Sequence, residues 1–231
     1  MTHNPQQELK KLSKKHDFFV GIDSDGCAFD TMEIKHKECF CPNFIKHWEL
    51  QKISKYAREV WEFVNLYSNT RGVNRFIALK ESFKWLDKRP DVQQRKFRVP
   101  DLSPLVEWTL KESRLGIPAL KEYAKTVNSP IIDTALSWAE EVNSDISDMV
   151  YGIAPFPFVE EAMQNISEQA DSIVVSQTPV EALEREWQEN KLDKFVSAIA
   201  GQEHGKKSEH LSITTKGKYA DDKIMMIGDA P

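Results

Sequence analysis

The apolar residues of the chain follow two different spacings, and these spacings divide it into two kinds of segment. Short runs rich in β-branched, aromatic and other apolar residues lie at 18–22, 172–175, 195–200 and 223–227. Runs of this length, bounded by turn residues, predict buried strands. Between the first two runs, apolar residues instead recur at three- and four-residue steps, which predicts amphipathic helices.

The middle of the chain, from Cys27 to about Pro155, is predicted to be helical. The expected helices cover 50–67, 73–86, 103–115, 118–127 and 132–142. Between them, 88–101 is expected to be a loop, because it is polar and bounded by two prolines, and Gly116 is expected to stop the helix that begins at Ser103. Five of the six tryptophans lie between Trp48 and Trp138, which indicates that this helical block has its own core.

The remaining helices alternate with the strands and predict the fold class. They are expected at 5–15, 158–169, 180–190 and 208–215, and Gly152 with the prolines after it marks a boundary. Alternating strands and helices predict an α/β fold with a parallel sheet and right-handed crossovers. The domains are therefore expected to be a core of 1–29 with 156–231, and an all-helical cap of 30–155 inserted between the first and second core strands.

Composition and charge limit the classes of partner. The 231 residues are 40% hydrophobic and 29% charged, with a net charge of −5, which is typical of a soluble, mildly acidic protein. The 31 basic residues are outnumbered by 36 acidic ones and form no long run, so no nucleic-acid partner is expected. Because the sequence shows no signal-peptide core and no run of membrane-spanning length, we expect a cytoplasmic protein without a membrane partner.

Two carboxylates follow the first predicted strand directly. Asp23 and Asp25 end the apolar run, and Gly26 then allows the chain to turn. Ligands of open α/β sheets bind at the carboxyl ends of the strands. Asp23 is therefore a candidate nucleophile or metal ligand and Asp25 a candidate general acid and base, whereas the simpler alternative is that both acids only cap a turn.

Polar residues also follow the other three predicted strands. Ser176 comes after the second strand, Lys206 and Lys207 after the third, and Asp229 after the fourth. This combination suits phosphoryl transfer, since a hydroxyl donates to a phosphate oxygen, a lysine neutralises phosphate charge and a carboxylate attacks in line. Mg²⁺ prefers carboxylate oxygens, which Asp23 and Asp229 supply.

The same four stretches resemble, in order, the four motifs of the haloacid dehalogenase-like (HAD) hydrolases. They read Phe-Val-Gly-Ile-Asp-Ser-Asp-Gly at 19–26, Val-Val-Ser at 174–176, Lys-Lys at 206–207 and Met-Met-Ile-Gly-Asp at 225–229. The resemblance covers about 17–30 and 155–231, and the helical block shares only the position of that family's inserted cap. It implies a Rossmann-like core, Mg²⁺ as cofactor and an aspartyl-phosphate intermediate on Asp23.

The resemblance also implies a role for each candidate residue. Asp25 would protonate the leaving group and later activate water, while its backbone carbonyl joins the metal shell. The implied catalytic residues are Asp23 and Asp25, the substrate-binding residues Ser176, Gln177 and Lys207, and the metal ligands Asp23, Asp25 and Asp229. Because dehalogenase members do not keep an acid at the position of Asp25, its presence favours phosphate-ester chemistry.

The sequence departs from the family pattern in two places. Serine, rather than the usual proline, follows the lysine pair, so either Lys206 or Lys207 can be the phosphate-binding lysine. We favour Lys207 because it directly precedes the predicted helix start at Ser208. The fourth motif usually carries another acid four residues after Asp229, beyond Pro231, so the core is expected to be truncated at its C-terminus.

The predicted function is that of a Mg²⁺-dependent phosphatase acting on a small phosphorylated metabolite. Two alternatives stay open, a phosphomutase of the β-phosphoglucomutase type and a non-catalytic module that binds a phosphometabolite. Arg71 and Arg75, near a predicted helix start, are candidates for binding a second anionic group, although solvated or ion-paired arginines are the more ordinary explanation. The identity of the phosphometabolite and the oligomeric state are left open.

Overall fold

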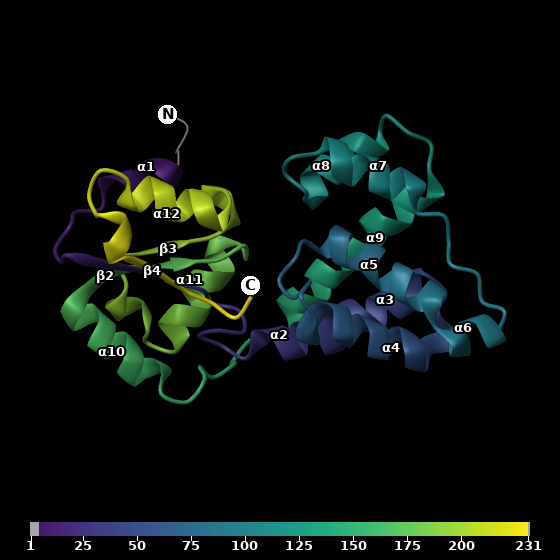
Figure 1. Cartoon of the computed structure of the whole chain (residues 1–231), viewed down its shortest axis with the longest axis horizontal. Helices are drawn as coiled ribbons and strands as arrows, with labels where there is room; N and C mark the ends of the chain where they lie inside the picture. Colours follow the sequence, from purple (N-terminus) through teal and green to yellow (C-terminus); the bar gives the residue numbers. More distant parts are fainter. Residues whose placement is uncertain (1–4, 231) are drawn as a thin grey trace. The chain divides into compact units, whose positions relative to one another are not determined.

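The computed structural model describes residues 5–230, which form two compact units. The first, here called the sheet unit, comprises the residues up to Thr31 together with Tyr151–Asp229. The second, the helical unit, comprises Met32–Val150 together with Ala230. The helical unit is thus inserted between the first and second strands of the sheet unit (Figure 1).

The sheet unit is built on a four-stranded parallel sheet with the strand order β3-β2-β1-β4. The strands are β1 (Phe18–Ile22), β2 (Ala170–Val175), β3 (Ala198–Ala200) and β4 (Ile224–Ile227). Ile22, the last residue of β1, pairs with Val174 on one side and Ile227 on the other. The predicted α/β class, with its helical insertion between the first two strands, is confirmed, and the segments after β1 and β4 leave the sheet at the same edge.

Four helices cover the two faces of this sheet. They are α1 (Pro5–Lys11), α10 (Val159–Gln169), α11 (Val180–Glu189) and α12 (Lys207–Thr215). Because successive side chains of a strand point to opposite faces, one set packs with Met163 of α10 and Trp187 of α11, and this set includes Val20, Ile22 and Val174. The other set packs with Leu211 of α12 and includes Phe19, Ile173 and Val175. Figure 1 shows α12 and α1 on one side of the sheet and α10 on the other.

Gly21, in the middle of β1, allows α12 to approach the sheet closely. A Cβ atom at this position would lie 2.6 Å from Leu211 Cδ2 and 2.9 Å from Met226 Sδ. Both distances are shorter than those of real Cβ contacts, so with a larger residue at this position the Leu211 and Met226 side chains would have to shift.

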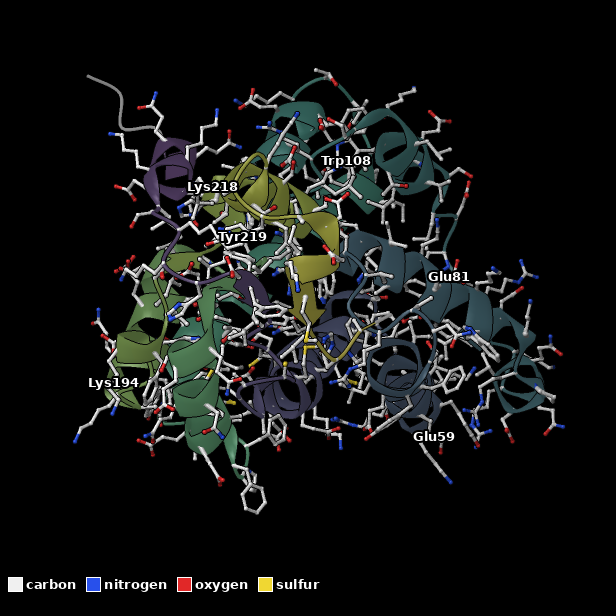
Figure 2. The ribbon with its side chains drawn as sticks, turned by 60° about the vertical axis from the view of Figure 1, so that its left-hand side comes forward. Glu59, Glu81, Trp108, Lys194, Lys218 and Tyr219 are labelled. Carbon is white, nitrogen blue, oxygen red and sulfur yellow. The ribbon has the colours of Figure 1, made fainter. Side chains whose placement is uncertain are left out.

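Asp171 is a buried acid at the start of β2 that joins two segments distant in sequence. It accepts hydrogen bonds from the backbone N–H groups of Lys15 (2.8 Å) and His16 (2.9 Å) and from the Tyr219 hydroxyl (2.7 Å). Tyr219, labelled in Figure 2, lies in the segment after α12. Burial raises the pKa of Asp171, but these hydrogen bonds outweigh it and hold the pKa below its ordinary value.

The helical unit has an aromatic core of its own, as expected from its tryptophans. Its helices are α2 (Thr31–Ile34), whose first residue lies in the sheet unit, α3 (Cys41–His47), α4 (Ser54–Glu62), α5 (Arg75–Lys88), α6 (Pro90–Gln94), α7 (Ser103–Lys111), α8 (Ile117–Ala124) and α9 (Pro130–Met149). Trp61 and Trp138 are fully buried and meet edge to face, with ring centroids 5.8 Å apart. No helix among residues 5–230 is long and apolar enough to span a membrane.

Several predicted boundaries in the chain were wrong. The expected helix over 50–67 is a 3₁₀ turn, then α4, then a π-helical turn at Phe63–Tyr67. Part of the expected loop over 88–101 forms α6, because Pro90 occupies a first-turn position where its missing N–H costs nothing. Gly116 precedes α8 as its N-cap instead of ending α7, which stops at Lys111. The expected helix over 5–15 ends at Lys11, and the expected strand over 195–200 shortens to β3.

Candidate active site

Asp23 is a buried carboxylate at the carboxyl end of the central strand. Its side chain and backbone are only 3% exposed, and its N–H donates to the Ile227 carbonyl at 2.9 Å. One carboxylate oxygen, Oδ1, accepts from the Ser24 N–H at 2.9 Å, and Oδ2 accepts from Lys207 Nζ. The structure thus brings Asp23 together with Lys207, while Lys206 is exposed.

The charge of Asp23 is only partly compensated. Burial raises its pKa, the Lys207 ammonium lowers it, and the nearby charges of Asp229 and Asp25 raise it again, so that the pKa lies above its ordinary value. The negative charges of Asp25 and Asp229 therefore repel that of Asp23 at this edge of the sheet. An added cation would relieve this repulsion, as would a proton.

Asp25 is held by hydroxyl groups at both of its carboxylate oxygens. Thr31 donates to Oδ1, and Thr178 donates to Oδ2 at 2.7 Å. Gly26, at φ +75°, makes the turn that follows, and its N–H donates to the Phe29 carbonyl at 2.8 Å. Neither threonine was among the predicted site residues, because hydroxyls in loops are too common for the sequence to single them out.

Ser24, between the two acids, anchors the turn to α11. It is fully buried, and its Oγ accepts from Trp187 Nε1 at 3.0 Å and donates to Glu186 Oε2 at 3.1 Å. This contact was not among those predicted from the sequence. The only signal in the sequence was a serine between the two acids of the first motif.

Ser176 and Gln177 follow β2, as expected, but they differ in what they contact. Ser176 is buried, its N–H donates to the Ala200 carbonyl at 2.9 Å, and its Oγ accepts from the Thr178 N–H at 3.1 Å. That leaves the Ser176 hydroxyl proton to donate to a ligand. The Gln177 amide instead donates to the carbonyls of Gly205 (2.9 Å) and Ser176 (3.3 Å), so both of its N–H bonds are used within the protein.

A divalent cation at this site would need oxygen ligands in addition to the acidic side chains. Among residues 5–230, no three histidine, cysteine, aspartate or glutamate side chains gather as a metal site. The Asp25 carboxylate is held by the two threonines, whereas its backbone carbonyl is a separate oxygen. Oxygen ligands and the only partly compensated negative charge around Asp23 suit Mg²⁺.

Cys27 lies beside this site but is unsuited to nucleophilic chemistry. Burial is the largest cause of a raised thiol pKa, and the charges of Asp23 and Asp229 add to it, giving a value of about 11. The thiol is therefore neutral at physiological pH, and a neutral thiol is a poor nucleophile.

The two arginines singled out for anion binding lie in the helical unit. Arg71 Nη1 donates to the Leu66 carbonyl at 3.0 Å. Arg75 Nη1 donates to the Ala139 carbonyl (3.2 Å) and to Asn143 Oδ1 (2.8 Å), and its guanidinium lies over the Phe40 ring. Burial lowers the pKa of Arg75 to about 10. No carboxylate of the described chain pairs with Arg75, in contrast to the ion-paired alternative.

Comparisons with known proteins give structural likeness only. No family model and no curated protein matches the chain. A haloacid dehalogenase-like family hydrolase from Streptococcus pneumoniae is similar with a TM-score of 0.47 and 13% identity, over 92% of this chain and 75% of that one. A HAD-superfamily hydrolase of subfamily IA from Geobacter sulfurreducens has a TM-score of 0.44 and 11% identity, over 94% and 82%.

A third similar structure is the HAD-hydrolase YfnB from Bacillus subtilis, which is described as bound to magnesium. Its TM-score is 0.44 and its identity 13%, over 94% of this chain and 79% of that one. These proteins carry the name of the family that the sequence motifs resemble. Because the TM-scores are below 0.5, function has to be inferred from the site itself.

Proposed function

We propose that the protein is a cytoplasmic, Mg²⁺-dependent phosphatase that hydrolyses a small phosphorylated metabolite through an aspartyl-phosphate on Asp23. The observation that carries this proposal is the contact between the buried Asp23 carboxylate and Lys207, at a strand end that also bears Asp25. In this proposal the core, 1–29 and 156–231, carries out the chemistry, and the helical domain, 30–155, selects the substrate.

The residues divide the reaction between them. Lys207 and the Ser176 hydroxyl bind phosphate oxygens, which neutralises their charge. An Asp23 oxygen attacks phosphorus while the ester oxygen leaves with its bonding electrons and takes a proton from Asp25. Asp25, now ionised, accepts a proton from the water that attacks the phosphoenzyme, which releases phosphate and restores Asp23.

The hydroxyl contacts of Asp25 support both of its protonation states. A threonine hydroxyl donates to a carboxylate oxygen, and after rotation it accepts from a carboxylic acid. Thr31 and Thr178 therefore keep Asp25 in place as it gains and loses its proton. This suits a residue that has to act first as acid and then as base.

Asp23, the Asp25 backbone carbonyl and Asp229 would hold the Mg²⁺ ion. When bound, the ion supplies positive charge that offsets the negative charge of the carboxylates and of the phosphate. The raised pKa of Asp23, caused first by burial and further raised by the two neighbouring acids, supports a need for such a charge.

The test is phosphate release from a panel of phosphorylated metabolites, with and without Mg²⁺. Release that requires Mg²⁺ and disappears in Asp23→Asn supports the proposal. Isomerisation of a sugar phosphate without release would replace it with a phosphomutase. Tight binding of a phosphometabolite by the wild type, without turnover of any substrate, would replace it with a binding module.

A further inference from the structure

The Gly205 carbonyl, two residues before Lys207, accepts hydrogen bonds from two different parts of the sheet unit. Gln177 Nε2 donates to it from the loop after β2, at 2.9 Å. His210 Nε2 lies 3.0 Å from the same oxygen, from within α12. A carbonyl oxygen only accepts, so the His210 proton resides on Nε2.

His210 is an unusual residue for the interior of the sheet unit. It is fully buried, and among the described residues no group satisfies its other ring nitrogen, Nδ1. Burial lowers its pKa to about 4, so the ring is neutral at physiological pH. An unsatisfied buried acceptor destabilises the folded state, and an apolar side chain in its place would avoid that cost. The contact that distinguishes histidine here is the one to Gly205.

The loop from Gly201 to Lys206 is held by hydrogen bonds on both sides of Gly205. Gly205 has φ +115°, where other residues are strained, and a Cβ atom there would lie 2.3 Å from Glu209 Oε2. Glu209 accepts from the Lys206 N–H at 2.7 Å, and His204 Nδ1 accepts from the Gly201 N–H at 3.3 Å. Hydrogen bonds therefore hold the loop on both sides of Gly205. The loop leads directly into the helix that begins with Lys207.

We propose that His210 is a positioning residue for Lys207. Its hydrogen bond to the Gly205 carbonyl holds the 201–206 loop in the conformation that brings Lys207 Nζ to Asp23 and to a phosphate oxygen of the substrate. The Gln177 amide, in the loop after β2, donates to the same carbonyl. This inference rests on the proposed function, because it assigns His210 a role in phosphate binding.

Two substitutions separate positioning from packing. His210→Gln keeps an N–H donor at a position similar to Nε2, whereas His210→Phe keeps the ring volume and removes the donor. We expect His210→Phe to weaken the binding of inorganic phosphate and to lower kcat/KM about tenfold, the usual effect of losing one hydrogen bond to a group that has to stay in place. His210→Gln is expected to remain within about threefold of the wild type.

Thermal unfolding distinguishes this role from a structural one. Since His210→Phe removes the unsatisfied Nδ1 as well, its Tm is expected to equal or exceed that of the wild type while phosphate binding weakens. Thr214→Val is the matched control. Thr214 is also buried in α12, but its hydroxyl donates to the His210 carbonyl and does not contact the loop, so it should lower Tm without weakening phosphate binding.

A double-mutant cycle tests whether the effect passes through Lys207. Inorganic phosphate binding is measured by calorimetry in the full chain with Lys207 and with Lys207→Ala. We expect His210→Phe to weaken binding only when Lys207 is present. If His210→Phe does not fold, Gln177→Met, at an exposed position, removes the other donor to the same carbonyl and should show the same dependence on Lys207.

Equal losses in both Lys207 backgrounds, or a loss in His210→Gln as large as in His210→Phe, would overturn the positioning role. A wild type that binds phosphate and hydrolyses esters, with His210→Phe unchanged, would overturn this inference and leave the phosphatase in place. A wild type that neither binds phosphate nor hydrolyses any ester would overturn both.

Discussion

The Thr178 hydroxyl donates a 2.7 Å hydrogen bond to Oδ2 of Asp25 and joins the turn after β2 to the turn after β1. These residues lie 153 positions apart in the chain, with the whole helical unit inserted between them. Thr31 donates to the other Asp25 oxygen. The orientation of the candidate acid and base thus depends on one hydroxyl directly before the insertion and on another in the turn after β2.

Thr178→Val is therefore expected to lower kcat while leaving KM nearly unchanged. The substitution keeps the shape of the side chain but removes its hydrogen bond to Asp25, which is worth about ten- to a hundredfold in rate if Asp25 carries the proton. Thr178→Ser retains the hydroxyl and should restore most of the activity. Steady-state phosphate release measures both parameters, and a kcat equal to that of the wild type in Thr178→Val would contradict the role of this contact.

Asp23→Asn is expected to abolish turnover and leave the fold intact. The amide does not attack phosphorus, so kcat should fall by at least about a thousandfold. The free energy of unfolding should change by no more than about 1–2 kcal/mol, because the substitution removes a buried charge but also the partner of Lys207. Asp30→Asn, at an exposed acid in the same segment, is the control and should keep full activity. Any substantial turnover in Asp23→Asn would disprove the nucleophile.

Ser24→Ala should destabilise the sheet unit by about 1–3 kcal/mol, because it leaves the buried Trp187 N–H without its acceptor. Trp187→Phe removes that donor, so the double variant should lose less than the sum of the two single variants. Denaturant unfolding of the four proteins gives the coupling free energy. Strict additivity would show that the serine and the tryptophan do not depend on each other.

Asp171 should make the stability of the protein fall in acid. Its pKa is lower in the folded than in the unfolded chain, so its stabilising contribution is complete above its ordinary value of about 3.8. The contribution is lost as the pH falls below that value and the carboxylate takes up a proton. Tyr219→Phe removes one of the hydrogen bonds that lower the pKa, and it should make the free energy of unfolding depend less steeply on pH below about 4. An unchanged slope would contradict this assignment.

The local elements were predicted best where neighbouring residues decide the conformation. Strands β1, β2 and β4 and helices α10 and α11 agree with the expected segments to within a few residues. The predictions failed where one local signal has two outcomes. Gly116 can end a helix or precede one, and Pro90 can break a helix or begin one, and the packing of the helical unit decides between them.

In the candidate site, too, some features follow from neighbouring residues and others only from packing. The residue types and their order already placed Asp23, Asp25, Ser176 and Asp229 after β1, β2 and β4, whose carboxyl ends lie at one edge because the strands are parallel. The pairing of Lys207 with Asp23 joins residues 184 positions apart, and that of Trp187 with Ser24 joins residues 163 apart. No local pattern encodes such pairs.

The spacing of the apolar residues and the residue types thus suffice to predict the class of fold, the insertion and the acids at the strand ends. Each of these follows from the order of local segments along the chain. The contact of Lys207 with Asp23, the hydroxyls on Asp25 and the unsatisfied ring of His210 arise from tertiary packing, although the predicted helix start already favoured Lys207 over Lys206. Packing brings distant polar groups into a dry interior, where each must find a partner or raise the free energy of the fold.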